Sequence, residues 1–581
     1  MKNPVRLLWS GWWIVVLCSV CLVAESEDML VVRVAGHYGG RLVVGQRAEA
    51  KTLNPVTALD RPSREVIGRF HADLIHINRN TQRTEAALAK SWTVSRDSRD
   101  YVLHLRQGIK FSDGQPFDAD DVVFSFRLYL DEKLNSPQRD LLLMEGQPIV
   151  VEKIDSTTVR FHLPKPYAAA ERIFDGLAML PRHLLERQYE DGTLPSAWPL
   201  SAPSEQIAGL GPFRLKKYVA GQSLTLERNP YYWKKDSKGQ RLPYLNELIF
   251  LPVPSEDAET LRFAAGETDV LNRISAQNFA QLSKDAAKNE FARKDLLLDL
   301  GPGLEYNFLL FNMNDDTAGR LPEVVKREAW FRQVDFRQAV SLAIDRAGIV
   351  RLAYDGRGVP LWSQVTPGNR LWENTALPHP AQSVQLAREK LSQAGFKWTP
   401  EGILTDSSGQ VVDFTIITSS SSTQRMQMAA MIQQDLGKLG MQVHIVSLEF
   451  RSFVQRVTQS HDYDAAIMAL ATGDVDPNGD MNVWASDGAT HLWNLGEKKP
   501  ATSWEAEMDA LMRQQLVTLD FQARKKLYDR VQQIVAEQLP VICIASPDIL
   551  VGARGRLENF RPAILEHYTL HNVDELSWTP Q

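Results

Sequence analysis

Residues 429–446, AAMIQQDLGKLGMQVHIV, hold a complete helix-to-strand unit. Ala429, Ile432, Leu436 and Leu439 recur at the spacing of one helix face. Gly440 follows them and supplies the usual helix stop. The next five residues alternate between hydrophobic and polar, which is the period of a half-buried strand. A helix that passes through glycine into a strand is typical of a mixed α/β fold.

Two more helices are predicted before residue 429, each from the residues at its start. Asp335, with Gln338 three positions later, resembles a capping box and predicts a helix that begins at residue 336. Ser383 is expected to cap another helix, which ends at Gly395. Helices therefore recur in the part of the sequence that precedes the unit at 429–446.

Strands are predicted on both sides of the same unit. Val159, Phe161 and Leu163 alternate with polar residues, as in a half-buried strand. A helix from about Asp520 ends at Pro540, and a hydrophobic strand with Cys543 follows it.

No repeat of 20–50 residues is visible, which argues against a solenoid or propeller. The fold class is therefore α/β.

Composition excludes several classes of protein. Hydrophobic residues make up 44% and charged residues 23% of the 581 positions, and 14 Trp, 14 Tyr and 22 Phe exclude a disordered chain. A mean hydropathy of −0.26 excludes a protein with many membrane spans. The net charge of −6 argues against a dedicated nucleic-acid binder, which needs a basic face.

The amino terminus has the layout of a secretory signal peptide. Lys2 and Arg6 precede a hydrophobic run that extends to Ala24, and acidic residues follow at once. We expect cleavage after residue 24 and a periplasmic mature protein, although an uncleaved membrane anchor fits the same pattern. Cys18 and Cys21 lack the small residues that precede a lipidated cysteine. The mature chain then keeps only Cys543, and its stability depends on a core and not on disulfides.

A series of short stretches follows the order and spacing of one protein family. They are 52–55 TLNP, 88–92 LAKSW, 105–114 LRQGIKFSDG, 119–122 ADDV, 211–213 GPF, 228–233 RNPYYW, 242–245 LPYL, 265–270 AGETDV and 337–346 RQAVSLAIDR. Together they resemble the family-5 extracellular solute-binding proteins, the peptide, dipeptide and nickel receptors of ABC importers. The resemblance extends from about residue 40 to 565.

This resemblance implies a two-lobed, periplasmic-binding-protein-like (type II) fold that closes around its ligand by a hinge motion. Lobe 1 is expected over residues 25–302, with an inserted subdomain at about 69–204. Lobe 2 is expected over 303–538, and residues 539–581 return to lobe 1. The implied partners are a small peptide or similar solute and the permease and ATPase subunits of an ABC transporter. A monomer without a cofactor is expected.

The resemblance also suggests a ligand site near Asp474. In the family's peptide receptors an Asp of the second lobe pairs with the α-amine of the ligand, and Thr472, Gly473, Asp474 and Asp476 match that segment. A solvated loop acid that stabilises a turn gives the same pattern. The order Asp-x-Asp-x-Asn-Gly-Asp also copies half of a calcium loop, but Ala485 replaces its final Glu.

Six other residues are candidates for ligand contact. Asp60 and Arg61 follow the TLNP segment, where peptide receptors offer extended backbone to the ligand. Tyr306 and Asn307 begin lobe 2, and Trp484 and Trp493 follow the Asp cluster, where core packing is the simpler interpretation. These six candidates, Asp60, Arg61, Tyr306, Asn307, Trp484 and Trp493, complete the predicted ligand site. The 12 His show no pairing typical of a metal site, so no metal site is predicted.

The function predicted from these residues is solute capture for an ABC importer, without catalysis. A secreted hydrolase is the main rival, but no G-x-S-x-G, S-x-x-K, H-E-x-x-H or G-x-x-x-x-G-K motif occurs. A periplasmic sensor for a sugar, an opine or a metal chelate is a second alternative, because one fold serves many ligands.

Overall fold

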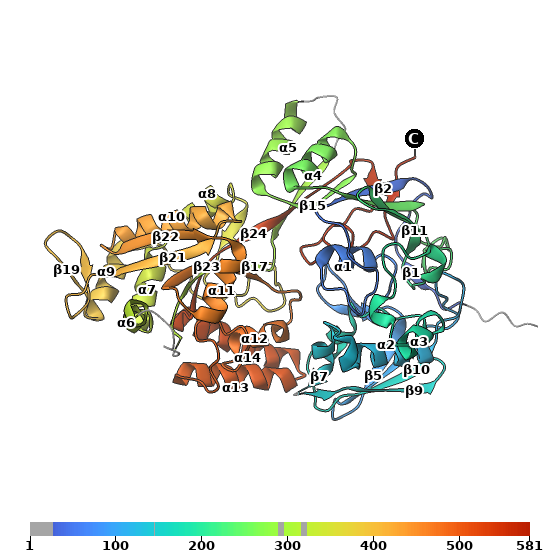
Figure 1. The fold of residues 1–581 in the computed structure, drawn as a ribbon, viewed down its shortest axis with the longest axis horizontal. Coiled ribbons are helices and arrows are strands. Elements are labelled where there is room, and N and C mark those ends of the chain that lie inside the picture. The colour runs from blue at the N-terminus through green and yellow to red at the C-terminus, as the bar shows by residue number, and fades with distance from the viewer. Residues whose placement is uncertain (1–26, 145, 289–294, 315–321, 581) are drawn as a thin grey trace, which may run out of the picture.

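The computed structural model describes residues 27–144, 146–288, 295–314 and 322–580. The predicted signal peptide at 1–24 lies outside these residues. Two bodies, each with its own large hydrophobic core, lie side by side and are joined by strands at one end (Figure 1). One core draws on residues between Val34 and Val270 and again on Ala553 to Leu576. The other draws mainly on residues between Leu304 and Ala545.

A 12-stranded sheet runs through both bodies. Its first half has the order β11-β12-β14-β2-β15, in which β14, β2 and β15 are parallel. Side chains on β12 and β14 alternate between buried and half-buried, so one face packs on the first core. The bounds are β2 Arg41–Gln46, β11 Phe213–Val219, β12 Ser223–Arg228, β14 Glu247–Pro252 and β15 Val270–Ile274.

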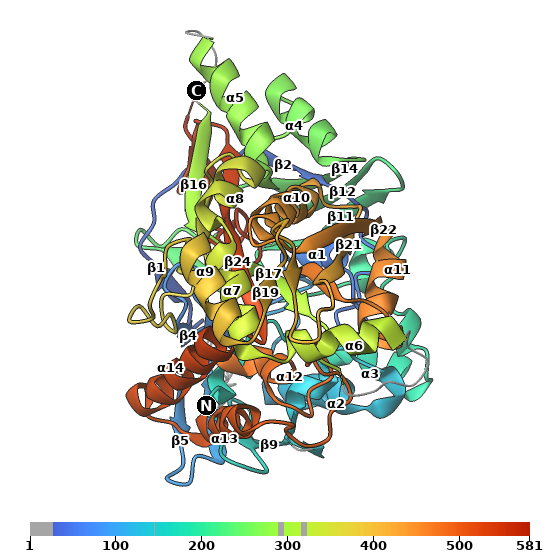
Figure 2. The same ribbon diagram turned by 90° about the vertical axis from the view of Figure 1, so that its left-hand side faces the viewer.

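The second half of the sheet has the order β17-β23-β21-β22 and is covered by helices. Figure 2 shows α7, α8 and α9 along the outer side of this body. The strands are β17 Glu305–Phe311, β21 Asp413–Ser419, β22 Gln442–Leu448 and β23 Ala465–Ala471. The helices are α6 Pro322–Phe331, α7 Val334–Ala343, α8 Arg346–Ala353, α9 Val384–Gln393 and α10 Thr423–Gly437.

The helix-to-strand unit at 429–446 is confirmed as α10 and β22. Gly440 adopts a φ of +83°, and a Cβ there would lie 2.2 Å from the carbonyl oxygen of Gly402. Glycine is therefore required both by the backbone conformation and by the close approach of another segment.

Two segments cross between the bodies. Strand β24, Val541–Ala553, pairs with β17 through Val541–Ala545 and with β16, Leu296–Pro302, through Asp548–Ala553. The chain passes from β16 into β17 at Gly303, whose N–H donates to the carbonyl of Pro547 at 3.1 Å. Because β18, Gly358–Pro360, pairs with the middle of β24, backbone hydrogen bonds tie the crossing together.

A separate four-stranded sheet forms a subdomain on the first body. Its order is β5-β6-β10-β9, and the predicted strand around Phe161 is β10. α2 packs on this sheet, and α3 packs on α2. The bounds are β5 Ala89–Val94, β6 Asp100–Leu105, β9 Val150–Asp155, β10 Thr158–His162, α2 Ala119–Leu130, η3 Ala170–Phe174 and α3 Arg182–Glu190.

The remaining elements complete the two bodies. Helix α5 packs on β24, and α13 and α14 pack on each other. The helices are α1 Arg61–Ile67, α4 Glu256–Ala265, α5 Ala276–Lys288, α11 Phe450–Gln455, α12 Met481–Trp484, α13 Ser503–Val517 and α14 Phe521–Gln538. The short strands are β1 Leu30–Val32, β3 Ile75–Ile77, β4 Thr84–Ala86, β7 Leu143–Met144, β8 Gln147–Pro148, β13 Lys234–Asp236, β19 Lys397–Trp398, β20 Leu404–Thr405, β25 Leu557–Glu558 and β26 Ser577–Trp578. Within the described residues, no helix has both the length and the hydrophobicity needed to cross a bilayer.

One of the two predicted helix caps is confirmed. Ser383 accepts a hydrogen bond from the first turn of α9. The helix start predicted near Asp520 is also confirmed, and the Asp520 side chain caps α14. The cap predicted at Asp335 is wrong, because α7 begins one residue earlier, at Val334. Asp335 lies in the first turn, where its charge favours the helix dipole, and it pairs with Lys390 at 3.1 Å.

Candidate functional site

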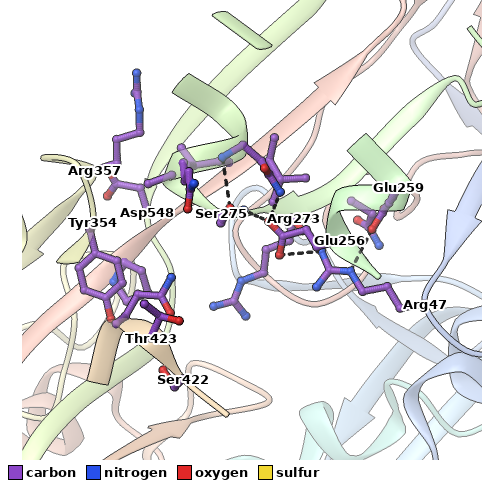
Figure 3. Close-up of a pocket in the computed structure, with 18 of the residues that line it drawn as sticks. Arg47, Glu256, Glu259, Arg273, Ser275, Tyr354, Arg357, Ser422, Thr423 and Asp548 are labelled. Atoms are coloured by element: carbon purple, nitrogen blue, oxygen red, sulfur yellow. Dashed lines mark hydrogen bonds and ion pairs between the residues drawn. The ribbon is translucent and has the colours of Figure 1, made fainter. Parts of the chain in front are cut away.

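A cavity of about 1060 Å³ lies between the two bodies beside the crossing strand β24. The first body contributes β2, α1, α4, β15 and α5, and the second contributes the ends of α8 and α10. Figure 3 draws Arg47, Glu256 and Glu259 on one side and Tyr354, Ser422 and Thr423 on the other. Six acidic side chains line it, namely Glu65, Glu256, Glu259, Glu305, Asp355 and Asp548. Six basic side chains line it as well, namely Arg47, Arg61, Arg273, Lys284, Arg357 and Arg425.

On the first wall, Arg47 holds two glutamates of α4. Its guanidinium lies 3.2 Å from Glu256 and 3.0 Å from Glu259. Burial raises the pKa of Glu259, and Arg47 opposes that shift. Glu256 also accepts hydrogen bonds from the backbone of Ser275 and the side chain of Asn278. These acids already have partners within the protein, so this wall offers little net negative charge to a solute.

Arg273 connects the first wall to the second body. Its guanidinium lies 2.8 Å from Glu305, at the start of β17. The backbone of Arg273 has a φ of +82°, which an L-residue rarely adopts, and its carbonyl accepts a hydrogen bond from Arg47 at 2.9 Å. Such a backbone conformation persists only where surrounding contacts hold it, and it is common at binding sites.

The second wall carries two donors that face the cavity. Tyr354 is 8% exposed, and its hydroxyl oxygen accepts a hydrogen bond from Asn307 at 3.0 Å. Burial raises the pKa of Tyr354, so the hydroxyl keeps its proton, which finds no acceptor among the described residues. Arg425, in the first turn of α10, forms no ion pair with a described residue. A cation there also opposes the helix dipole.

The crossing strand supplies an acid with an altered proton affinity. Burial, and then the negative charge of Asp299, raise the pKa of Asp548 to about 6. Arg357 pairs with Asp299 at 2.8 Å and partly offsets this effect. The charge of the cavity next to β24 therefore changes near pH 6.

Of the residues predicted at the site, only Arg61 lines the cavity. Its guanidinium lies 3.8 Å from Glu566 and 5.4 Å from the ring centre of Tyr568. Asp60 precedes it and caps α1, accepting from the backbone N–H and the hydroxyl of Ser63 at 2.9 Å. Asp60 therefore has a structural role that the sequence motif does not reveal.

The aromatic candidates lie in the core. Tyr306 and Asn307 follow Glu305 in the chain, and they are 1% exposed and fully buried, respectively. Asn307 orients Tyr354 by donating a hydrogen bond to its hydroxyl oxygen. Trp484 and Trp493 are also buried, and the Trp493 indole donates to Glu505 at 3.0 Å. The core interpretation of both tryptophans fits these positions, and direct ligand contact by them stays a prediction.

The loop at Asp474 lies outside the cavity lining. Thr472 and Gly473 lead out of β23, and both oxygens of Asp474 accept hydrogen bonds from the guanidinium of Arg172. Asp476 is buried and makes two hydrogen bonds of 2.7 Å with Arg524. The first two acids of the calcium-like pattern are therefore paired with arginines. A role for Asp474 in binding an amine stays a prediction.

Sequence reasoning missed most of the cavity's polar residues. Arg47, Arg273, Tyr354 and Arg425 belong to no recognisable motif. The partners of the first three lie on other elements of the chain. Glu305 was detectable in principle, because it stands next to Tyr306 and successive residues of a strand face opposite sides.

Comparison with known proteins supports the interpretation of this cavity as a binding site. The model of the bacterial extracellular solute-binding proteins, family 5, middle region, matches residues 83–491. A probable ABC transporter-binding protein of Deinococcus radiodurans is 27% identical over 517 residues, covering 86% of this chain and 85% of the relative. The oligopeptide-binding protein AppA of Bacillus subtilis is 24% identical and covers 94% of both chains.

A solved structure has the same fold. The ABC transporter substrate-binding protein CtaP of Listeria monocytogenes superposes with a TM-score of 0.75 at 23% identity. The match covers 94% of this chain and 100% of that protein. The predicted two-lobed α/β fold is confirmed.

Proposed function

Because the chain belongs to the bacterial extracellular solute-binding proteins of family 5, and is thus a solute-binding receptor, we propose that it captures a peptide-like solute between its lobes. The observation that carries this proposal is the cavity of about 1060 Å³ with walls from both bodies. Pockets for small molecules usually enclose about 300–1,000 Å³, so a short peptide fits this space. The oligopeptide-binding relative supports the choice of solute.

Capture proceeds by closure of the two lobes about their crossing strands. A solute that contacts both walls has its full set of contacts only in the closed form, so it shifts the population toward that form. The pairing of β24 supports a second crossing near Asp548, about ten residues beyond the boundary predicted at 538. Gly303 and Pro547 face each other there and form the pivot.

The free carboxylate of the peptide binds to the second wall. Arg425 supplies an unpaired guanidinium, and Tyr354 supplies a hydroxyl proton. Lobe 1 contributes Arg61 from the opposite side. These three donors therefore favour a solute with at least one negatively charged end.

The receptor delivers its solute to the permease and ATPase subunits of an ABC transporter on the outer side of the inner membrane. The Deinococcus relative, named as an ABC transporter-binding protein, supports this partner. The receptor acts as a monomer and performs no catalysis, in keeping with a family of receptors. A pull-down from membranes that recovers a permease and an ATPase tests the first part, and recovery of neither contradicts it.

The solute is identified by native mass spectrometry of the purified protein. A series of co-purified peptide masses supports the proposal, and one defined sugar overturns it. The identified peptide is then compared with the same peptide amidated at its carboxyl end. Amidation and the substitution Arg425→Gln are each expected to weaken binding about tenfold, and the two effects are not expected to add.

Controls separate charge from general damage. Arg425→Lys keeps the charge and should lose less affinity than Arg425→Gln. Arg351→Gln removes an exposed arginine of the neighbouring helix α8 outside the cavity lining and should leave affinity unchanged. Equal binding of the free and amidated peptides contradicts the assignment of Arg425, although it leaves peptide capture intact.

A further inference from the structure

The carboxylate of Asp474 is bound by a single arginine of the other lobe. The Nε and Nη2 atoms of Arg172 donate to its two oxygens, and Nη1 donates to the carbonyl of Gln82 at 3.1 Å. One oxygen of Asp474 also accepts from the N–H of Val475 at 2.7 Å. This carboxylate therefore has little capacity left for another cation.

The two partners are anchored in different cores. Arg172 lies in η3 beside Ile173 and Phe174, which belong to the core of the first body. Asp474 immediately precedes Val475, which belongs to the core of the second body. The pair consequently reports the distance between the bodies and breaks when they separate.

Other contacts between the bodies surround this pair. Gln82 donates to the carbonyl of Gly368 and Arg370 to that of Asn80, both at 2.7 Å, and the N–H of Ala168 donates to Leu516 at 2.6 Å. None of these residues lines the cavity. We call this set the closing belt: Asn80, Gln82, Ala168 and Arg172 with Gly368, Arg370, Asp474 and Leu516.

The closing belt lies away from the crossing strands. In Figure 1, α12, which follows Asp474 closely, and α13, which carries Leu516, approach the subdomain at the end of the molecule opposite β24. Ile77 of β3 adds hydrophobic contact, because it is buried in the core of the second body. The bodies are therefore joined covalently at one end and by the closing belt at the other.

A paired guanidinium and carboxylate here favour closure by themselves. The side chains of Arg172 and Asp474 are 13% and 27% exposed, so the pair is partly shielded from water. Its two charge-assisted hydrogen bonds form a bidentate contact, which is a strong arrangement.

We propose that Arg172 closes the lobes of this receptor without a solute, because its pair with Asp474 joins the two bodies outside the cavity. This inference goes beyond the proposed capture of a peptide. It holds for whatever solute the cavity takes, since none of the closing belt lines the cavity.

Single-molecule energy transfer tests the closing contact in the full chain. Dyes are placed at Ile154→Cys and Phe450→Cys, two exposed positions on different bodies, in protein freed of solute by unfolding and refolding. Cys18 and Cys21 are replaced by Ser, and Cys543 stays buried. Arg172→Gln and Asp474→Asn are each expected to lower the ratio of closed to open molecules about fivefold. The exchanged pair Arg172→Asp with Asp474→Arg is expected to recover part of it.

A matched control is Arg327→Gln, which removes an arginine paired with Asp464 at 2.9 Å within the second body. It should leave the ratio unchanged. The proposal is overturned if both single variants retain the wild-type ratio, if the control opens the molecule as much as they do, or if the exchanged pair recovers nothing.

Discussion

Asp548 and Asp299 place two carboxyl groups next to each other on the crossing strands. Burial and the charge of Asp299 raise the pKa of Asp548 to about 6, whereas the unfolded chain titrates near 4. The native state therefore binds the extra proton between these values. The stabilisation from this group is fully present below about pH 4 and is lost as the pH rises through about 6.

The substitution Asp548→Asn removes that pH dependence. We expect it to raise the free energy of unfolding at pH 8 by about 1–2 kcal/mol and to have little effect at pH 4. Urea denaturation at both values measures the difference. Asp355→Asn, an exposed acid at the same cavity, should change stability by less than about 0.5 kcal/mol at either pH. A gain that is equal at both pH values contradicts this origin.

For single residues, the sequence predicts local roles such as helix capping better than it predicts contacts between distant parts of the chain. The cap at Ser383 and the helix start near Asp520 were predicted because these residues are adjacent in the chain to the helices that they begin. The pair of Arg172 and Asp474 spans 302 positions, so no local pattern could reveal it. The motif that suggested an amine site at Asp474 shows the acid but not the arginine that the fold brings to it.

Among the elements, β24 differs most from its prediction. The hydrophobic run at 540–545 predicted a short strand, yet β24 continues to Ala553. Ser546, Pro547 and Asp548 interrupt the hydrophobic pattern because the strand leaves the second core at Ala545. It then packs in two smaller clusters and reaches the first core at Ala553. By contrast, α10 and β22 each pack on a single core, so their periodicity is unbroken and was read correctly.

Gly303, at the proposed pivot, is predicted to resist substitution. A Cβ at this position would lie 2.7 Å from Cδ1 of Ile549. We expect Gly303→Ala to lower the free energy of unfolding by about 1–3 kcal/mol and to hinder closure. Urea denaturation and the solute-dependent radius of gyration measure the two effects.

Two further variants separate crowding from backbone strain. Gly301→Ala places a Cβ in open space at a φ of +80°, so it should cost about 1 kcal/mol and leave closure unaffected. Combining Gly303→Ala with Ile549→Val should recover part of the loss, because the nearest atom is removed. If Gly301→Ala hinders closure as much as Gly303→Ala, contact with Ile549 is not the cause.

The whole molecule has two large cores connected by two crossing segments. Phe161 is fully buried in the first core and Phe331 in the second. Each core buries its own hydrophobic side chains, so we expect solute-free protein to unfold in two calorimetric transitions. A solute that requires both walls stabilises both bodies together by mass action and should merge the transitions.

Core substitutions assign these transitions. Phe161→Ala and Phe331→Ala each remove about 3–5 kcal/mol from one body. In the absence of solute, each is expected to lower one transition by roughly 10 °C and leave the other in place. With saturating solute, either variant should lower the merged transition. If both shift one common transition before any solute is added, the lobes already unfold as a unit, and the link between them is stronger than the crossing strands and the closing belt account for.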